Sequence, residues 1–244
     1  DGGGEGVAGL LGELQRTYES TVLLAVWDRL SALAAEATLA AGLDAPRDAG
    51  HMTLLEAEAM RRVVARAPVR SVCEVGFNAG HSAVAILLAR PASSEERDLS
   101  GETRGPSGEA APPPLSLLSI DIAEHPYVAR AADLVRKLFP NSRFRFEKGD
   151  SLHVLQTLAD RGEKCDLVRI DGGHLEGRPW EDLSAAARLA SGPRLVWMDD
   201  VGCSNWNCEE PTRAWAEALR TGLVREEECS VEQPTHGFCL GVFA

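Results

Sequence analysis

From Arg70 onward, short apolar segments alternate with amphipathic ones, and this alternation constrains the fold more than any other feature of the sequence. Each apolar segment has the length of a β-strand. The segment that follows it has apolar residues at the three- and four-residue spacing of a helix. The strands are expected at SVCEV, LSLLSID, FRFEKGD, CDLVRID and RLVWMDD. Strands and helices that alternate in this way form a parallel sheet covered by helices on both faces.

The two ends of the chain depart from this alternation. The last apolar segments, LVREEECSV and GFCLGVFA, have no helix between them and predict an antiparallel hairpin around Gln233-Pro234. Residues 7–66 are rich in Ala, Leu and Glu, which favours helices, with Thr53 as an N-cap. The predicted fold class is α/β: a Rossmann-like, doubly wound, seven-stranded sheet, mostly parallel with a C-terminal antiparallel hairpin, plus N-terminal helices.

We expect two parts in the chain. Residues 1–66 would form a helical extension or lid, and residues 67–244 the α/β domain. Residues 91–114 interrupt that domain, because they are rich in Pro, Gly, Ser and Glu and contain almost no large apolar side chain. Such a composition predicts a flexible surface insertion. With 244 residues, 44% of them apolar, the chain is long enough to bury a full core.

The net charge of the chain argues against some classes of binding partner. Its 37 Asp and Glu residues outnumber 25 Lys and Arg residues, for a net charge of −12. An acidic surface repels phosphate backbones and anionic lipids, so neither nucleic acid nor a membrane is an expected partner. No apolar run has the length of a membrane span, and no signal-peptide pattern is present. We expect a cytoplasmic protein that acts on a small-molecule acceptor. The oligomeric state, including a homo-oligomer, stays open. A removed targeting segment also stays open, since the chain does not begin with Met.

The cysteines are expected to be free thiols. None of them forms a C-x-x-C pair, which argues against a zinc site. Two lie in strand-like segments, two share one loop, and two could face each other across the C-terminal hairpin. The chain is not a small disulfide scaffold, so free thiols are favoured over bridges. In chain order the six are Cys73, Cys165, Cys203, Cys208, Cys229 and Cys239.

The segment EVGFNAGHS joins the first strand to its helix. It does not fit the dinucleotide fingerprint G-x-G-x-x-G, because after Gly76 the next two required glycines are replaced by Asn78 and His81. This mismatch argues against a nicotinamide-dependent oxidoreductase. The pattern is instead E-x-G-x-x-x-G-x-S, which runs from Glu74 to Ser82. An ordinary strand-to-helix turn is the alternative interpretation.

This pattern resembles motif I of the class I S-adenosylmethionine (SAM) methyltransferases, and most closely the catechol O-methyltransferase-like branch. In that family the acid and the turn hold the methionine end of SAM, whose ammonium and sulfonium groups suit a carboxylate. The resemblance implies SAM as cofactor and S-adenosylhomocysteine as product. It implies cofactor contacts from Glu74, Gly76, Phe77, Asn78, Gly80 and Ser82.

The ends of the next two strands supply further candidates for cofactor binding. Asp121 lies 41 residues after Gly80, and without the 24 residues of the insertion the separation would be 17. That is close to the spacing of an acid that binds a ribose diol, the role we expect for Asp121. In the family the end of the third strand binds the adenine, which implies contacts from Gly149, Asp150 and Ser151.

Three carboxylates follow the fourth and fifth strands. Asp171 closes one strand, and Asp199 and Asp200 close the next. Carboxyl ends of neighbouring parallel strands lie at the same edge of a sheet, so these acids should converge, with Asp171 also beside the cofactor. Clustered carboxylates repel unless a cation neutralises them, and oxygen ligands suit Mg²⁺ or a similar divalent cation. The alternative is that these aspartates serve as helix N-caps.

His174 follows Asp171 after two glycines, at the same edge of the sheet. Its imidazole is placed to accept a proton near neutral pH. The combination D-G-G-H and M-D-D-V resembles the metal-dependent sugar O-methyltransferases of the macrocin and mycinamicin type. In those relatives the acids bind the metal and the histidine is the base. The resemblance thus implies metal ligands at Asp171, Asp199 and Asp200, and a catalytic base at His174.

Together these features predict a SAM-dependent, Mg²⁺-dependent O-methyltransferase that acts on a hydroxyl of a sugar or phenol. A non-catalytic SAM-binding domain is the principal alternative. The acceptor is not identified, because the loop VGCSNWNCEEP after Asp200 matches no motif. Trp180 and Trp206 either stack on an acceptor or pack in the core, and His51 and Met52 are assigned to an N-terminal lid.

Overall fold

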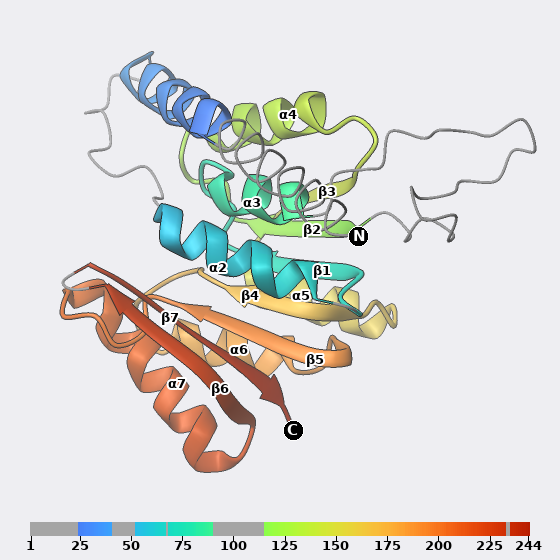
Figure 1. Cartoon of the computed structure of the whole chain (residues 1–244), viewed down its shortest axis with the longest axis vertical. Helices are drawn as coiled ribbons and strands as arrows, with labels where there is room; N and C mark the ends of the chain where they lie inside the picture. Colours follow the sequence, from blue (N-terminus) through green and yellow to red (C-terminus); the bar gives the residue numbers. More distant parts are fainter. Residues whose placement is uncertain (1–23, 41–51, 67, 90–114, 233–234) are drawn as a thin grey trace, which may run out of the picture.

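The computed structural model describes residues 24–40, 52–66, 68–89, 115–232 and 235–244, and its centre is one seven-stranded sheet (Figure 1). The strand order is β3-β2-β1-β4-β5-β7-β6. The first five strands pair in parallel, and β7 runs antiparallel to both β5 and β6. This confirms the predicted fold class. The strands are β1 (Ser71–Val75), β2 (Ser116–Asp121), β3 (Arg143–Lys148), β4 (Cys165–Ile170), β5 (Ala190–Asp199), β6 (Val224–Glu232) and β7 (His236–Phe243).

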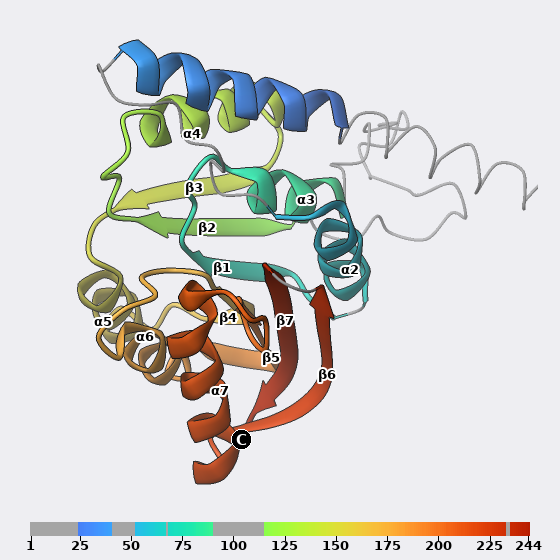
Figure 2. The same cartoon turned by 90° about the vertical axis from the view of Figure 1, so that its left-hand side faces the viewer.

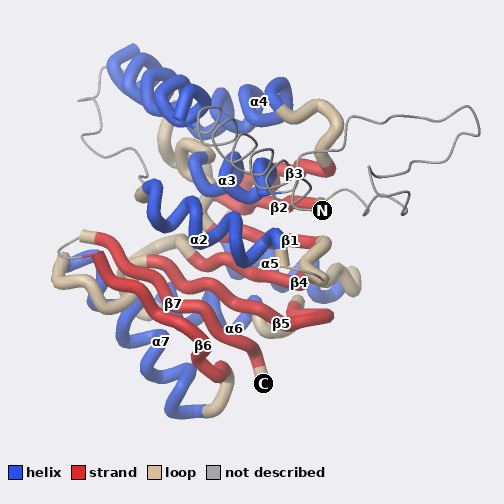
Figure 3. Tube along the Cα trace, viewed as in Figure 1, coloured by secondary structure: helices blue, strands red, loops and turns tan. Residues whose placement is uncertain are grey.

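Helices cover both faces of the sheet, as the alternation predicts (Figures 2 and 3). One face is covered by α2 (Leu54–Ala65), α3 (His81–Ala89) and α4 (Val128–Leu138). The helix of residues 24–40 packs on α3, where Trp27 and Ser31 contact His81. The other face packs against α5 (Ser151–Asp160), α6 (Arg178–Ala186) and α7 (Glu209–Thr221). A short 3₁₀ turn, η1 (Trp206–Cys208), precedes α7. Within these described ranges, no helix is long and apolar enough to cross a membrane.

A polar row crosses the sheet on the face that α2 and α3 cover. Residues in register on parallel strands point to the same face. Ser119 of β2 is in register with Glu74 of β1, Glu74 with Arg169 of β4, and Arg169 with Trp197 of β5. All four side chains are buried. A row of hydrogen-bonding groups therefore replaces part of the apolar core at this level of the sheet.

Local signals in the sequence explain two further elements. Thr53 caps α2 in a capping box, in which its side chain accepts from the backbone of Glu56 and the Glu56 carboxylate accepts from the backbone of Thr53. The N-cap prediction and the C-terminal hairpin are both confirmed, although turn residues 233–234 lie outside the described residues. The insertion at 91–114 and His51 also lie outside them, and Met52 is a buried core residue.

The expectation of free thiols is wrong. The described chain contains three disulfides and no free cysteine. One joins Cys73 to Cys165 on the adjacent strands β1 and β4, where both side chains are buried. The others close short segments, Cys203–Cys208 within one loop and Cys229–Cys239 across the hairpin. Chain length misled the prediction, because it does not report which side chains the fold brings together.

We expect a denatured, unreduced sample of the protein to take up no alkylating reagent. After reduction, six cysteines should be labelled, because all six are paired in the structure. Intact-mass spectrometry after treatment with N-ethylmaleimide in guanidinium chloride measures both states. Labelling of any cysteine before reduction would contradict the corresponding bridge.

Candidate active site

The strand order reverses between β1 and β4, and two cavities open beyond the carboxyl ends of these strands. In doubly wound sheets this is where ligands bind. The first cavity, of about 350 Å³, lies over the ends of β1 and β2. The second, of about 640 Å³, lies over the ends of β4 and β5. They share four lining residues, Asn78, His125, Asp171 and Gly172, so the two cavities meet at the switch point.

The glycine turn after β1 forms one wall of the first cavity. Gly76 has φ +90°, and a Cβ added there would lie 1.7 Å from the carbonyl oxygen of Asp171. The end of β4 therefore leaves no space for a side chain at residue 76, whether or not a ligand is bound. Asn78 also has positive φ, and its side-chain oxygen accepts a hydrogen bond from the Tyr127 hydroxyl at 2.6 Å. The turn thus packs closely on the end of β4 at Gly76 and is hydrogen-bonded to Tyr127 at Asn78.

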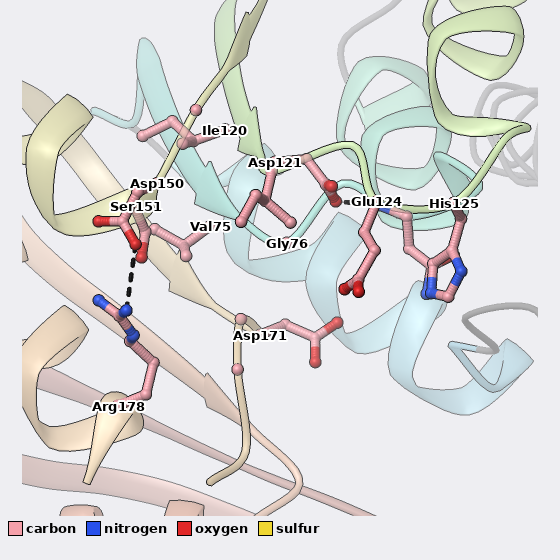
Figure 4. A pocket seen from close by; sticks show the side chains of 15 residues that line it. Val75, Gly76, Ile120, Asp121, Glu124, His125, Asp150, Ser151, Asp171 and Arg178 are labelled. Atoms are coloured by element: carbon pink, nitrogen blue, oxygen red, sulfur yellow. Dashed lines mark hydrogen bonds and ion pairs between the residues drawn. The ribbon is translucent and has the colours of Figure 1, made fainter. Parts of the chain in front are cut away.

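Asp121, at the end of β2, supports the same turn. One of its carboxylate oxygens accepts hydrogen bonds from the backbone N–H groups of Phe77 (3.0 Å) and Asn78 (2.8 Å). The other accepts from the N–H of Ala123 at 2.7 Å. The carboxylate also lines the cavity (Figure 4). Asp121 therefore links the shape of the turn to the ligand space, a structural role that the ribose assignment did not include.

The first cavity is acidic. Figure 4 shows the side chains of Glu124 and Asp171 directed toward the same space, with Asp121 beside them. On the opposite side, Arg178 forms an ion pair with Asp150 at 3.1 Å. Of the described lining residues, Arg178 alone is Lys or Arg, so the cavity favours a ligand that carries positive charge.

The start of α5 forms the far end of the first cavity. Asp150 caps this helix, accepting from the N–H groups of Leu152 and His153. The Ser151 hydroxyl donates to Asp182 at 2.5 Å, and Gly149 lies beside them in the lining. The N-cap interpretation thus applies to Asp150. It does not apply to the acids of the fourth and fifth strands, since the N-cap residues of α6 and α7 are Gly177 and Cys208.

Four residues predicted to contact the cofactor do not line the first cavity: Glu74, Phe77, Gly80 and Ser82. Glu74 is fully buried and accepts hydrogen bonds from the hydroxyls of Ser82 and Ser119. Phe77 points into the core, where its ring packs on those of Phe144 and Phe146. These side chains lie outside the cavity lining, because alternation along β1 turns Glu74 toward the helices and away from the ligand space.

Asp171, Asp200 and His174 converge at the junction of the two cavities. Nε2 of His174 lies 3.5 Å from Asp171 and 3.4 Å from Asp200. Burial lowers the pKa of His174, but the hydrogen bond to Asp171 and the nearby carboxylates outweigh it and raise the pKa. Burial and the charges of Asp171 and Asp199 raise the pKa of Asp200 to about 8. The negative charge of the cluster therefore favours one more bound positive charge, either a proton or a cation.

Arg169 is the charged partner that the sequence analysis missed. It is buried in β4, and its guanidinium bonds to Asp171 at 2.8 Å, to Asp199 and, at 3.4 Å, to Glu74. Burial opposes its charge, but these three acids hold its pKa above the usual range. The argument that three clustered carboxylates require a metal is thus weakened, because an internal cation already neutralises part of their charge.

Two of the three predicted metal ligands, Asp171 and Asp200, belong to a group of atoms that could hold a cation. The Asp199 carboxylate is bound to Arg169, whereas oxygens of Asp171 and Asp200 and a ring nitrogen of His174 lie within 4.8 Å of one another. Two carboxylates and an imidazole are suitable ligands for a divalent cation. The geometry therefore favours Asp171 and Asp200 as the carboxylate ligands of such a cation, with the His174 imidazole beside them.

A sequence profile for a family described as "Methyltransferase domain" matches residues 73–201, which include the glycine turn and every acid of the cluster. The chain belongs to this methyltransferase family. No curated protein matches it in sequence. The resemblance to SAM methyltransferases inferred from EVGFNAGHS and DGGH is in agreement with this result.

Solved structures agree on the fold. Cofactor-bound Rv0187 from MTB is 19% identical, with a TM-score of 0.64 over 91% of this chain and 89% of its own. The O-methyltransferase TomG from Streptomyces achromogenes, in complex with SAM, is 18% identical, with a TM-score of 0.61 over 88% and 89%. An O-methyltransferase from Bacillus cereus in complex with SAH is 15% identical, with a TM-score of 0.59 over 88% and 91%.

The N-terminal part of this methyltransferase adds a further acid near the cluster. Glu56 of α2 is 2% exposed, and burial together with the charge of Asp199 raises its pKa to about 8. One Glu56 oxygen, Nε of Arg169 and Nε1 of Trp197 are buried without a hydrogen-bond partner among the described residues. Helix α2 therefore covers the polar row of the sheet with polar atoms of its own.

Two sequence signals for these missed residues existed. Arg169 interrupts an otherwise apolar strand, and a charge inside a buried strand requires a partner. Glu56 stands three residues after Thr53, the spacing of a capping box, but that spacing does not indicate the acid's proximity to Asp199. His125 and Glu124, which line the first cavity, carry no comparable signal, because they lie in the irregular segment between β2 and α4.

We expect Arg169→Met to lower the free energy of unfolding by about 3–5 kcal/mol, because it leaves buried acids without their cation. The matched control is Arg220→Met, which removes an exposed ion pair with Glu217 and should change stability little. Urea unfolding followed by circular dichroism at neutral pH measures both. Equal unfolding midpoints for the two variants would contradict the central role assigned to Arg169.

Proposed function

We propose that this methyltransferase transfers the methyl group of SAM to a hydroxyl of a small molecule. The observation that carries the proposal is the acidic cavity at the switch point, walled by the glycine turn and lined by Asp121, Glu124 and Asp171. SAM carries an ammonium and a sulfonium, and such a cavity favours both. Two similar structures, those of TomG and the Bacillus cereus enzyme, are complexes with SAM and SAH, respectively.

Within this proposal the two cavities hold the two substrates. SAM would occupy the first cavity, with its ribose at Asp121 and its adenine near Asp150 and Ser151. The acceptor would occupy the second cavity, with its hydroxyl at the junction beside His174. The acceptor oxygen attacks the methyl carbon in line, the bond from carbon to sulfur breaks, and the sulfonium becomes the thioether of S-adenosylhomocysteine. Positioning of the two reactants supplies much of the rate.

His174 is the proposed base. It takes the hydroxyl proton in its neutral form, which is favoured once the two facing carboxylates, Asp171 and Asp200, are neutralised. A divalent cation fits this place, with Asp171 and Asp200 as oxygen ligands, and it would lower the pKa of a hydroxyl bound to it. Arg169 would fix the orientation of Asp171 from below, through its 2.8 Å hydrogen bond.

Calorimetric titration with S-adenosylhomocysteine tests the cofactor, with NAD as the negative control. We expect micromolar affinity for the first ligand alone. Asp121→Ala should weaken it about 10- to 100-fold, because the variant loses charge-assisted hydrogen bonds to the turn and to the ribose. Asp133→Ala, which removes an exposed acid of α4, serves as the matched control. Absence of S-adenosylhomocysteine binding by the unaltered protein would reject the proposed function.

His174→Ala should reduce kcat about 10²- to 10⁴-fold, the loss typical of a general base, while S-adenosylhomocysteine affinity stays within twofold. The control is His153→Ala, an exposed histidine of α5. Transfer of a tritiated methyl group to the acceptor measures the rate, with and without EDTA. A loss below tenfold would remove His174 from the role of base, and full activity in EDTA would exclude a required divalent cation.

A further inference from the structure

SAM carries a carboxylate at its methionine end, in addition to its ammonium and its sulfonium. The first cavity repels such a group, because its lining includes four acids, Asp121, Glu124, Asp150 and Asp171. A carboxylate that passes from water into this cavity therefore requires hydrogen-bond donors that face it. The proposed function thus requires a binding site for a carboxylate within an acidic cavity.

The order of the lining residues indicates at which end of the cavity this site lies. Figure 4 shows Asp150 and Arg178 at one end, Glu124 and His125 at the other, and Asp121 between them. With the ribose at Asp121 and the adenine near Asp150, the methionine part of SAM extends to the end of Glu124 and His125. The Arg178 guanidinium lies at the adenine end, paired with Asp150 at 3.1 Å, so it is not the partner of the carboxylate.

The glycine turn has few donors left for this carboxylate. Four of its backbone N–H groups donate to carbonyl or carboxylate oxygens of the protein itself, those of Gly76, Phe77, Asn78 and Gly80. The hydroxyl of Ser82, in the helix that follows, donates to the buried Glu74. A carboxylate beside the turn therefore depends on side-chain donors from elsewhere in the lining.

Asn78 and His125 are two such side chains. Both line the first and the second cavity, so they lie where the two cavities meet. The Asn78 Oδ1 atom accepts from the Tyr127 hydroxyl, whereas its amide nitrogen has no acceptor among the described residues. The His125 imidazole is exposed and forms no hydrogen bond within the described ranges. Since an imidazole keeps an N–H in either tautomer, both side chains can donate to a carboxylate.

The other histidines of the two cavities are less suited to this role. His174 and His236 line the second cavity and not the first. In addition, Nε2 of His174 already lies 3.5 Å from Asp171 and 3.4 Å from Asp200. Of the described histidines, His125 alone lines the first cavity.

Tyr127, the residue before α4, positions both donors. Its hydroxyl donates to Asn78 at 2.6 Å, which leaves the amide N–H groups of Asn78 for a ligand. Its ring is stacked on the His125 imidazole, with 5.2 Å between the ring centroids and 8° between the planes. Tyr127 is buried, and burial together with the charge of Asp121 raises its pKa to about 12. The hydroxyl therefore remains a donor at neutral pH.

We propose that Asn78 and His125 bind the carboxylate of the cofactor and that Tyr127 is the positioning residue of this pair. The imidazole and the amide each donate a hydrogen bond to the carboxylate, while Glu124 and Asp171 face the ammonium. The sulfonium then lies between the ribose and the pair, beside the second cavity. This inference rests on the proposed use of SAM and adds His125 and Tyr127, which lie outside the glycine motif.

The test compares two ligands that differ only in the carboxylate, S-adenosylhomocysteine and its decarboxylated analogue S-adenosyl-3-thiopropylamine. In calorimetric titrations we expect the unaltered protein to bind the first at least about tenfold more tightly. His125→Ala should weaken S-adenosylhomocysteine binding about 10- to 100-fold, the loss typical of a charge-assisted hydrogen bond, and should change the affinity of the analogue less than about twofold.

Two further variants serve as controls for His125→Ala. His125→Gln retains an N–H donor and should restore part of the lost affinity for S-adenosylhomocysteine. His153→Ala removes an exposed histidine of α5 and should leave the affinity for both ligands unchanged.

Tyr127→Phe tests the positioning role, because it keeps the ring beside His125 and removes the hydroxyl that holds Asn78. We expect a loss of S-adenosylhomocysteine affinity of about three- to tenfold, with the analogue affected less than about twofold. Thermal unfolding followed by circular dichroism verifies that the variant is folded. Equal losses for the two ligands would overturn the positioning role of Tyr127.

The remaining outcomes separate this inference from the proposed function. Equal affinity of the unaltered protein for the two ligands would overturn the carboxylate site, as would an unchanged affinity of His125→Ala for S-adenosylhomocysteine. Equal losses for both ligands in His125→Ala would also overturn it, because His125 would then act on the shape of the cavity. All three outcomes leave the cofactor assignment intact. Absence of S-adenosylhomocysteine binding by the unaltered protein would reject the proposed function and this inference with it.

Discussion

The buried guanidinium of Arg169 is the interaction on which the site depends. It lies between Glu74 beneath the glycine turn and the acids Asp171 and Asp199 at the ends of β4 and β5. Without a cation at this level, the three carboxylates would repel one another, and the two buried ones, Glu74 and Asp199, would face a large desolvation penalty. The Arg169 side chain joins the end of β1 to the ends of β4 and β5. These are the strand ends over which the two cavities lie.

The polar row extends this connection across the sheet to the N-terminal part of the chain. Ser119 and Ser82 satisfy the Glu74 carboxylate, and α2 places Glu56 over the far end of the row. A helix that covers polar atoms is positioned more specifically than one that covers an apolar surface, because each buried polar group requires a partner. The N-terminal segment is therefore coupled to the acid cluster by electrostatics as well as by packing.

The division of charge between the cavities gives each a distinct chemistry. The first cavity is acidic around the glycine turn, with Arg178 and Asp150 at its far end, and it suits a cationic cofactor. The second joins the acids to amides and one exposed indole. At their meeting point, where Asp171 lies beside His174, the acceptor would lose its proton to His174 and receive the methyl group from SAM. The same acids thus serve both halves of the proposed reaction.

The sequence by itself determined the order of strands and helices, the position of the glycine turn and the edge of the sheet where the acids gather. These follow from local periodicity and chain direction, which neighbouring residues encode. Only the tertiary structure decided that Arg169 neutralises the acids, that Glu74 and Phe77 face away from the ligand space, and that Trp206 lines a cavity while Trp180, partly buried, packs against the core. It also paired the cysteines, since Cys73 and Cys165 are 92 residues apart. Such pairings depend on strand register and helix placement, which bring distant residues together and which no local pattern records.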